Sequence, residues 1–210
     1  MAKRIITISR EFGSGGRFIG EEVAKKLGIA YYDKDIIGQI AEQSGLSPEY
    51  IKENAELSPK KGLFAYAFAG RDITGKSIED MVYEAQRKVI LELAGKEPCV
   101  IVGRNADYIL KDSPDVMNVF IYAPKQDEIS AVMKKSGLNQ HKAEEEWENV
   151  EKSQHARHEY ITGKKRGDRH TRDILLNSSL LGWNATAQVI EELVERKFGL
   201  KDEKALLKEA

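Results

Sequence analysis

A short apolar strand, a glycine-rich turn and a helix follow one another at the start of the chain, and this order most constrains its fold. Residues 5–8 (IITI) form a β-branched apolar run, which is typical of a strand buried on both faces. The turn 12–16 (FGSGG) follows, and then Ile19, Val23 and Leu27 recur with helical spacing. A strand that leads through glycines into a helix is a common phosphate-binding unit of α/β proteins.

The rest of the chain continues this alternation of strands and helices. Strands that alternate with helices imply a parallel sheet covered by helices, so the predicted fold class is α/β. The length of 210 residues fits a single domain over 1–210. Apolar runs predict further strands at 29–32, 99–102, 116–122 and 173–176, and periodicity predicts further helices at 35–43, 77–95, 124–135, 143–160 and 184–198.

Charge and composition exclude several classes of protein. The 33 basic and 34 acidic side chains leave a net charge of -1, without the basic excess of a general nucleic-acid binder or membrane-surface protein. The sequence has no apolar stretch near the roughly 20 residues that cross a bilayer, and no secretory segment at its start. The single cysteine, Cys99, excludes a disulfide framework and is expected to be buried. We therefore expect a cytoplasmic protein. The composition does not determine its oligomeric state.

The glycine-rich turn is the first candidate site. Its backbone N–H groups, from Gly13, Ser14, Gly15 and Gly16, can converge on phosphate, and the following helix adds about half a positive charge. The turn departs from the pattern GxxxxGK[ST], because with Gly15 as the last motif glycine, Gly16 stands at the lysine position. Arg17 follows and can bind phosphate bidentately, so it is our candidate replacement. A turn that binds nothing is the alternative.

A basic segment at 154–172 is the second candidate. It holds six arginines and lysines against two acidic residues, with glycines as candidate hinges. Such a segment predicts a lid that closes cations over polyphosphate, and a solvated loop is the alternative. Its three histidines lack the cysteines or paired carboxylates that complete a metal site, so we expect no metal ligands there. The candidate anion-binding residues are Arg157, Arg166, Arg169 and Arg172.

Polar residues also follow two of the predicted strands. Arg104 and Asn105 come just after the strand at 99–102, and Asp33 follows the strand at 29–32. The carboxyl ends of parallel strands are where α/β sheets place their ligands. An arginine there can hold an anionic group, and an aspartate can bind a substrate hydroxyl or a metal. A surface arginine and a helix-capping aspartate are the alternatives.

In their order along the chain, these segments resemble the cytidylate kinase-like family, a branch of the P-loop nucleoside monophosphate kinases with a modified P-loop. The resemblance is carried by ITISREFGSGGRFIGEEVAKKLGIAYYDKDII, CVIVGRNADYIL and RHEYITGKKRGDRHTRDILLNSSLLG. It implies a P-loop kinase fold, with a five-stranded parallel sheet flanked by helices. It also implies a monophosphate-binding insertion over 33–76 and a lid over 154–172, and we expect a frayed tail over 199–210.

The resemblance further implies that the γ-phosphoryl group of ATP is transferred, with Mg²⁺, to a small-molecule nucleotide such as CMP or dCMP. Two alternatives stay open, because Gly16 and Asn105 depart from the family pattern. One is a nucleotide-binding sensor or partner-binding protein that has lost catalysis, and the other is a P-loop kinase of another small-molecule acceptor. Carried over by position, the catalytic residues are Arg17, Arg104 and Arg157, the ATP-phosphate ligands are Gly13 to Arg17, the acceptor ligands are Asp33, Arg104 and Asn105, and the lid residues are Arg166, Arg169 and Arg172.

Overall fold

A five-stranded parallel sheet forms the centre of the molecule in the computed structural model, which describes residues 4–33, 36–45, 47–48 and 78–199. The strand order is β2-β3-β1-β4-β5, and every neighbouring pair is parallel. The predicted fold class is confirmed, and each predicted strand lies within two residues of its expected bounds. The strands are β1 (Ile5–Arg10), β2 (Ala30–Tyr32), β3 (Cys99–Val102), β4 (Val116–Tyr122) and β5 (Ile174–Asn177).

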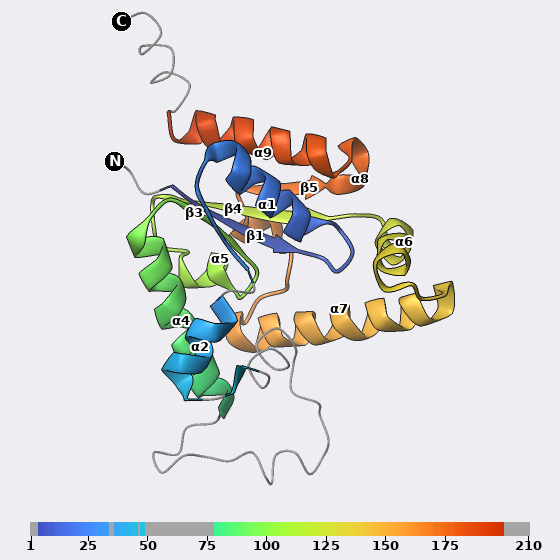
Figure 1. The fold of residues 1–210 in the computed structure, drawn as a ribbon, viewed down its shortest axis with the longest axis horizontal. Coiled ribbons are helices and arrows are strands. Elements are labelled where there is room, and N and C mark those ends of the chain that lie inside the picture. Colours follow the sequence, from blue (N-terminus) through green and yellow to red (C-terminus); the bar gives the residue numbers. More distant parts are fainter. Residues whose placement is uncertain (1–3, 34–35, 46, 49–77, 200–210) are drawn as a thin grey trace, which may run out of the picture.

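Helices connect these strands and cover the sheet (Figure 1). The longer helices match the predicted ones, except that α7 begins three residues earlier than expected. The Asn139 side chain accepts the Lys142 N–H at 3.0 Å and so caps the start of α7. The shortest elements, α5, η1 and α8, were not predicted, because three or four residues show no periodicity. The helical elements are α1 (Gly16–Leu27), α2 (Ile36–Ser44), α4 (Ile78–Lys96), α5 (Ala106–Ile109), α6 (Lys125–Ser136), α7 (Gln140–Thr162), the 3-10 turn η1 (Arg169–Thr171), α8 (Ser178–Leu181) and α9 (Trp183–Lys197).

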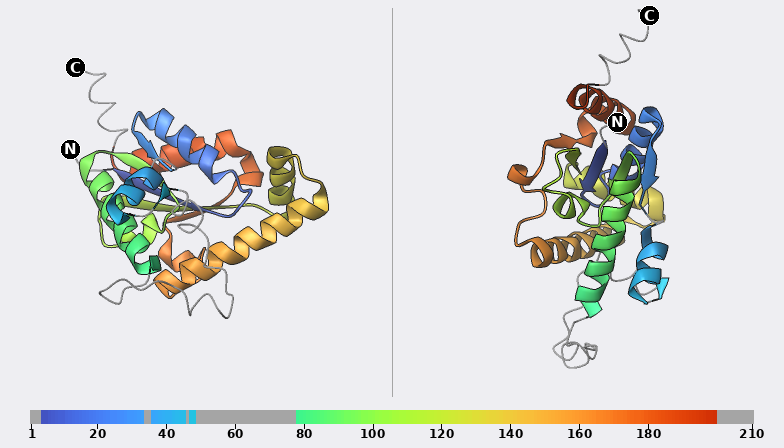
Figure 2. Two further views of the ribbon diagram at one scale, coloured as in Figure 1. Left: turned by 60° about the horizontal axis from the view of Figure 1, so that its bottom comes forward. Right: turned by 90° about the vertical axis from the view of Figure 1, so that its left-hand side faces the viewer.

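Alternating side chains along the strands divide the core into two layers. Ile6 and Ile8 face one side of the sheet, where they pack with α1 and α9. Ile5 and Ile101 face the other side, where they pack with α2, α4 and α5. Figure 1 and Figure 2 show these helices on opposite faces of the sheet. Cys99 is fully buried in the second layer, as predicted, and the enclosure of both faces explains why the strands are largely apolar.

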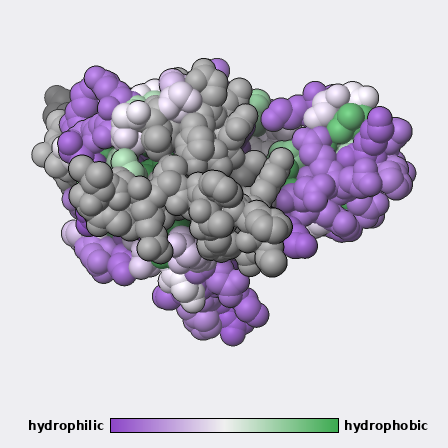
Figure 3. All heavy atoms as spheres, turned by 90° about the horizontal axis from the view of Figure 1, so that it is seen from below, coloured by the Kyte–Doolittle hydropathy of each residue, from purple (hydrophilic) through white to green (hydrophobic). Residues whose placement is uncertain are grey.

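The helices α6 and α7 form a third, smaller cluster at one end of the sheet. Ile129, Val132 and Ala143 are its buried residues, and Phe12 and Trp147 pack against them. The face seen in Figure 3 is mainly hydrophilic over this end of the molecule. Since Phe12 comes from the glycine-rich turn, α6 and α7 help to hold that turn in place.

Two of the expected segments lie partly or wholly outside the described residues. Of the insertion expected over 33–76, the structure describes Asp33, residues 36–45 with helix α2, and residues 47–48. Of the tail expected over 199–210, it describes only Gly199. The basic segment 154–172 comprises the last turns of α7, a loop and η1. Among the described helices, none is both long and apolar enough to cross a membrane.

Candidate active site

Residues 11–16, which we call the phosphate loop, turn tightly between β1 and α1. Gly13 and Gly15 adopt left-handed conformations with φ of 94° and 81°, which residues with a Cβ rarely adopt. Ser14 is fully buried, and its hydroxyl donates to the Glu11 carbonyl at 2.9 Å. The loop therefore delivers the N-terminus of α1, with its positive dipole, to the carboxyl end of β1.

Gly13 is packed too closely for any side chain. A Cβ there would lie 2.5 Å from the Glu128 carbonyl oxygen of α6, in addition to the strain of its φ of 94°. We expect Gly13→Ala to lower the free energy of unfolding by about 3 kcal/mol. Gly137→Ala, at a φ of 67° with nothing within 4 Å of a Cβ, is the matched control and should lower it by about 1 kcal/mol. Urea unfolding measures both, and equal losses would show that the contact with α6 is irrelevant.

The turn at 103–105 carries three consecutive left-handed residues. Gly103, Arg104 and Asn105 have φ of 70°, 60° and 52°, and each of the two non-glycine residues costs roughly 1–3 kcal/mol. The Nε2 of Gln86, a fully buried residue of α4, donates to the Arg104 carbonyl at 2.5 Å. The Asn105 Oδ1 lies 3.0 Å from the His158 Nδ1 of α7. Packing thus holds a strained backbone at the carboxyl end of β3, as is common at functional sites.

Arg17 and Asp33 form an ion pair between α1 and the end of β2. The Arg17 Nε lies 3.1 Å from the Asp33 Oδ2. Asp33 is buried, and its Oδ1 has no hydrogen-bond partner among the described residues. Two predicted site residues therefore lie together beside the phosphate loop.

An ion pair holds the segment after α7 against the phosphate loop. The Glu151 Oε1 accepts the Phe12 N–H at 2.7 Å, and its Oε2 lies 2.8 Å from the Arg166 Nη1. Arg166 also donates to the Arg10 carbonyl. Burial opposes ionisation of Glu151, but the hydrogen bond from His155, the charge of Arg166 and the Phe12 N–H lower its pKa below the ordinary value. Arg166 is thus docked on the loop through a carboxylate.

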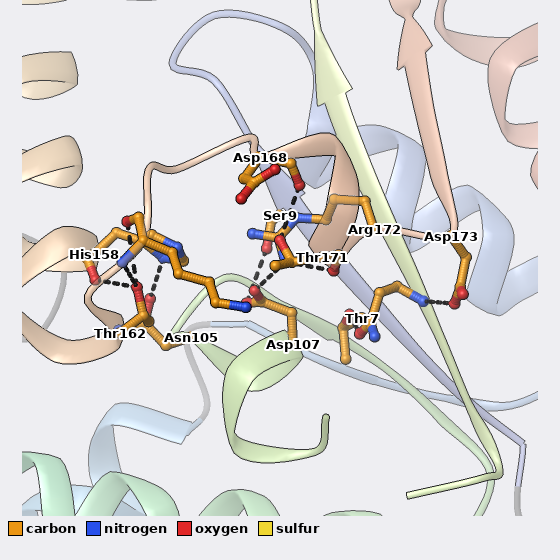
Figure 4. A network of polar contacts seen from close by, with 12 residues as sticks. Thr7, Ser9, Asn105, Asp107, His158, Thr162, Asp168, Thr171, Arg172 and Asp173 are labelled. Carbon is orange, nitrogen blue, oxygen red and sulfur yellow. Dashed lines mark hydrogen bonds and ion pairs between the residues drawn. The ribbon is translucent and has the colours of Figure 1, made fainter. Parts of the chain in front are cut away.

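A second ion pair ties the same segment to the sheet. Arg172 contacts Asp107 of α5, and both side chains are buried. Ser9 donates its hydroxyl to the other carboxylate oxygen of Asp107 at 3.1 Å, as Figure 4 shows. Arg169, in contrast, is exposed beside His170. The three predicted lid arginines therefore differ, because the side chains of Arg166 and Arg172 are buried and Arg169 faces solvent.

A polar cavity of about 40 Å³, which we call the arginine cavity, lies between β1, the turn at 103–105 and α7. Four arginines line it: Arg10, Arg104, Arg157 and Arg166. Arg104 and Arg157 are only 6% and 7% exposed. His158 also lines the cavity, and burial lowers its pKa, so it adds little charge at neutral pH. Four guanidinium groups in one small cavity suit the binding of phosphate oxygens.

The structure brings four of the predicted site residues into the arginine cavity. They are Arg104, Asn105, Arg157 and Arg166. The other arginine candidates are placed elsewhere, with Arg17 against Asp33, Arg172 against Asp107 and Arg169 at the surface.

No site role was predicted from the sequence for Gln154, His158, Arg10 or Glu151. Gln154 and His158 line the cavity together with Arg157, and their spacing of three and four residues places them on one face of α7. That spacing is a signal that could have identified both. Arg10 and Glu151 carry no comparable local signal, because their roles depend on contacts between distant segments.

Glu11 of the phosphate loop and Glu128 of α6 are neighbouring carboxyl groups with raised pKa values. Glu128 of α6 is fully buried, and it accepts hydrogen bonds from the Ala123 N–H at 3.1 Å and the Trp147 Nε1 at 2.8 Å. Burial and the neighbouring Glu11 raise the pKa of Glu128 to about 8. Burial, together with Glu151, also raises the pKa of Glu11. The pair therefore retains a proton at neutral pH.

This retained proton makes stability fall as the pH rises. The pKa of Glu128 is about 8 in the folded chain, against an ordinary value of 4.5, so its stabilising contribution is full below pH 4.5 and is lost as the pH rises through about 8. We expect the free energy of unfolding to fall by at least about 1 kcal/mol between about pH 6 and pH 8.5. Glu11→Gln should flatten this decline, because its amide can donate to the Glu128 carboxylate. Guanidinium unfolding at both pH values measures it, and equal declines would argue against a shared proton.

The model of the cytidylate kinase-like family matches residues 5–180 of the chain. This range includes the phosphate loop, the turn at 103–105 and the arginine cavity. The chain is also similar to a cytidylate kinase of Ignicoccus hospitalis, at 23% identity over 191 residues. The match covers 90% of this chain and 98% of that protein.

Solved structures share the fold. A protein from Eubacterium ventriosum superposes with a TM-score of 0.67 at 24% identity, covering 92% of this chain and 99% of that one. A shikimate kinase from Acinetobacter baumannii, in complex with shikimate, has a TM-score of 0.52 at 15% identity, covering 91% and 93% of the two chains. The chain therefore has the P-loop kinase fold.

Proposed function

The chain belongs to the cytidylate kinase-like family, and from this premise we propose that it transfers the γ-phosphoryl group of ATP to a nucleoside monophosphate, namely CMP or dCMP. The observation that carries the proposal is the arginine cavity, where side chains from β1, the turn at 103–105, α7 and the segment after α7 converge. Phosphoryl transfer requires little covalent chemistry from a protein. It requires fixed positive charge around the transferred group, which this cavity supplies.

On the donor side, the proposal assigns the ATP phosphates to the backbone N–H groups of Gly13–Gly16 and to Arg17. The Ser14 hydroxyl shapes the loop, because it is bonded to the Glu11 carbonyl. The Phe12 N–H and Arg166 now hold the Glu151 carboxylate, and a phosphate oxygen would take its place. The basic segment 154–172 thus serves as a lid that exchanges one anion for another.

On the acceptor side, the proposal assigns the monophosphate to Arg104 and Asn105, on the strained turn after β3. We also assign Asp33 to the acceptor, because its buried Oδ1 suits either a substrate hydroxyl or Mg²⁺, which prefers oxygen ligands. When bound there, the magnesium ion neutralises charge on the phosphate oxygens. Arg157 then faces the transferred group from α7 and stabilises the charge that spreads over its equatorial oxygens.

The test is ADP release by the purified protein with Mg-ATP and each of CMP, dCMP, UMP, AMP and GMP. A reaction without acceptor is the control. We expect acceptor-dependent turnover of roughly 1–100 s⁻¹, highest with CMP or dCMP. Absence of acceptor-dependent turnover with all five would contradict the proposal.

The nucleotide substrates also imply a cytoplasmic setting.

A second candidate is a nucleotide-binding protein without phosphoryl transfer, which acts as a sensor or binds a partner. Two observations favour it. Gly16 stands at the lysine position, and one N–H group of the phosphate loop, that of Phe12, already donates its hydrogen bond to the Glu151 carboxylate. Calorimetry distinguishes it, because it predicts tight ATP binding without ADP formation. A kinase of another hydroxylated small molecule, suggested by Asn105, would instead consume ATP only with a non-nucleotide acceptor.

A further inference from the structure

The structure shows what fills the space of the missing P-loop lysine. Gly16 is buried at the start of α1, and a Cβ there would lie 2.5 Å from the Arg10 Cβ and 2.9 Å from its Cγ. The stem of Arg10 therefore crosses the position that a side chain at residue 16 would take. A lysine side chain at residue 16 would therefore clash with the Arg10 side chain in its observed position.

The far end of the Arg10 side chain passes a second glycine. A Cβ on Gly103 would meet the Arg10 Nη1, with the Cζ 3.0 Å away. Arg10 thus runs from the phosphate loop to the strained turn after β3. Two glycines that are far apart in the sequence leave room for one side chain, so its path is a defined feature of the fold.

The backbone of Arg10 is fixed as well. Arg10 is in register with Ile121 of β4, and the following N–H, of Glu11, donates to the Ile121 carbonyl at 2.9 Å. The Arg10 carbonyl accepts a hydrogen bond from Arg166. Its side chain lines the arginine cavity together with Arg104 and Arg157. A fixed backbone and a confined stem therefore place a permanent positive charge between the proposed donor and acceptor sides.

We propose that Arg10 supplies the catalytic cation that a lysine supplies in the usual phosphate loop, by binding oxygens of the phosphoryl group in transfer. This inference rests on the proposed function. The cation comes from the end of β1 rather than from the start of α1, and its planar guanidinium can bind two oxygens at once. Arg17, the replacement expected from the sequence, forms an ion pair with Asp33 and does not line the arginine cavity.

The first test compares Arg10→Ala with Arg196→Ala, an exposed arginine in the last turn of α9. Two readouts are used: acceptor-dependent ADP release, and calorimetric binding of tripolyphosphate. We expect Arg10→Ala to lower turnover about ten- to a hundredfold and to weaken tripolyphosphate binding about tenfold, the range of one charge-assisted contact. Arg196→Ala should change neither. Values for Arg10→Ala within about twofold of the native protein in both readouts would overturn the inference.

A second test moves the charge back to the lysine position. Arg10→Gly removes the stem that blocks residue 16, so the double variant Arg10→Gly/Gly16→Lys has room for the new side chain. We expect it to bind tripolyphosphate at least about tenfold more tightly than Arg10→Gly alone. A folded double variant, checked by circular dichroism, that gains nothing would count against the inference.

The two readouts separate this inference from the proposed function. Suppose that Arg10→Ala weakens tripolyphosphate binding but no acceptor supports ADP release by the native protein. The kinase proposal then fails, and Arg10 remains assigned to an anion-binding site. If acceptor-dependent turnover is normal and Arg10→Ala alters neither readout, only the Arg10 inference fails.

Discussion

Arg157→Ala should lower kcat by about a hundred- to a thousandfold while leaving the KM for ATP within a few-fold of the native value. Arg157 is 7% exposed on α7 and lines the arginine cavity, so its guanidinium has a defined position. A cation that supports charge developing in the transition state affects kcat more than substrate binding. Steady-state kinetics with the best acceptor measures the change.

The matched control for this prediction lies on the same helix. Lys152 of α7 is exposed and is not part of the cavity lining, so Lys152→Ala should leave both kinetic constants unchanged. Arg157→Lys keeps the charge but loses the planar fork, and we expect intermediate turnover. If Arg157→Ala retained native kcat, the transferred group would not lie beside α7.

Arg104→Ala should lower kcat/KM for the acceptor by about a thousandfold, with little change in ATP binding. The Arg104 guanidinium is buried in the arginine cavity, whereas its carbonyl is held by Gln86 at 2.5 Å. Removing the side chain therefore removes the proposed contact with the acceptor phosphate and leaves the backbone anchor intact. Acceptor titrations at saturating ATP, together with ATP calorimetry, measure the two effects separately.

The left-handed backbone of Arg104 supplies an internal control. Arg104→Gly relieves the strain of a φ of 60°, so it should be more stable than Arg104→Ala by about 1 kcal/mol. Both variants lack the guanidinium and should be equally inactive toward the acceptor. If Arg104→Gly were active and Arg104→Ala inactive, the conformation of the turn, and not the guanidinium, would determine turnover.

The sequence predicts the sheet well, because its strands are enclosed on both faces. The segments 99–102 and 116–122 are largely apolar because helices cover both faces of the sheet there. Parallel sheets bind ligands at the carboxyl ends of their strands, and this rule selects Arg104 and Asn105 from the sequence. In the structure both residues line the arginine cavity. Features that depend only on local pattern and parallel topology are therefore predictable from the sequence.

The remaining parts of the site depend on contacts that no local pattern contains. The Phe12 N–H meets Glu151 across 139 positions, and Arg166 reaches Arg10 across 156. The sequence motif shows that a lysine is missing at Gly16, but it does not show that another side chain occupies the same space. The absence of a motif residue is therefore not by itself a loss of function, because a side chain from another position can replace it.

Glu151 also determines how the arginine cluster responds to its surroundings. Guanidinium groups gathered in one cavity repel each other, and dissolved anions would ordinarily screen that repulsion. Here a carboxylate tethered to α7 serves as the counter-ion, because it bonds both Arg166 and the Phe12 N–H. A tethered counter-ion keeps the same local concentration at any ionic strength. One of the four guanidinium groups, that of Arg166, therefore carries its counter-ion on the chain itself, so its neutralisation before a phosphate binds does not depend on ions from solution.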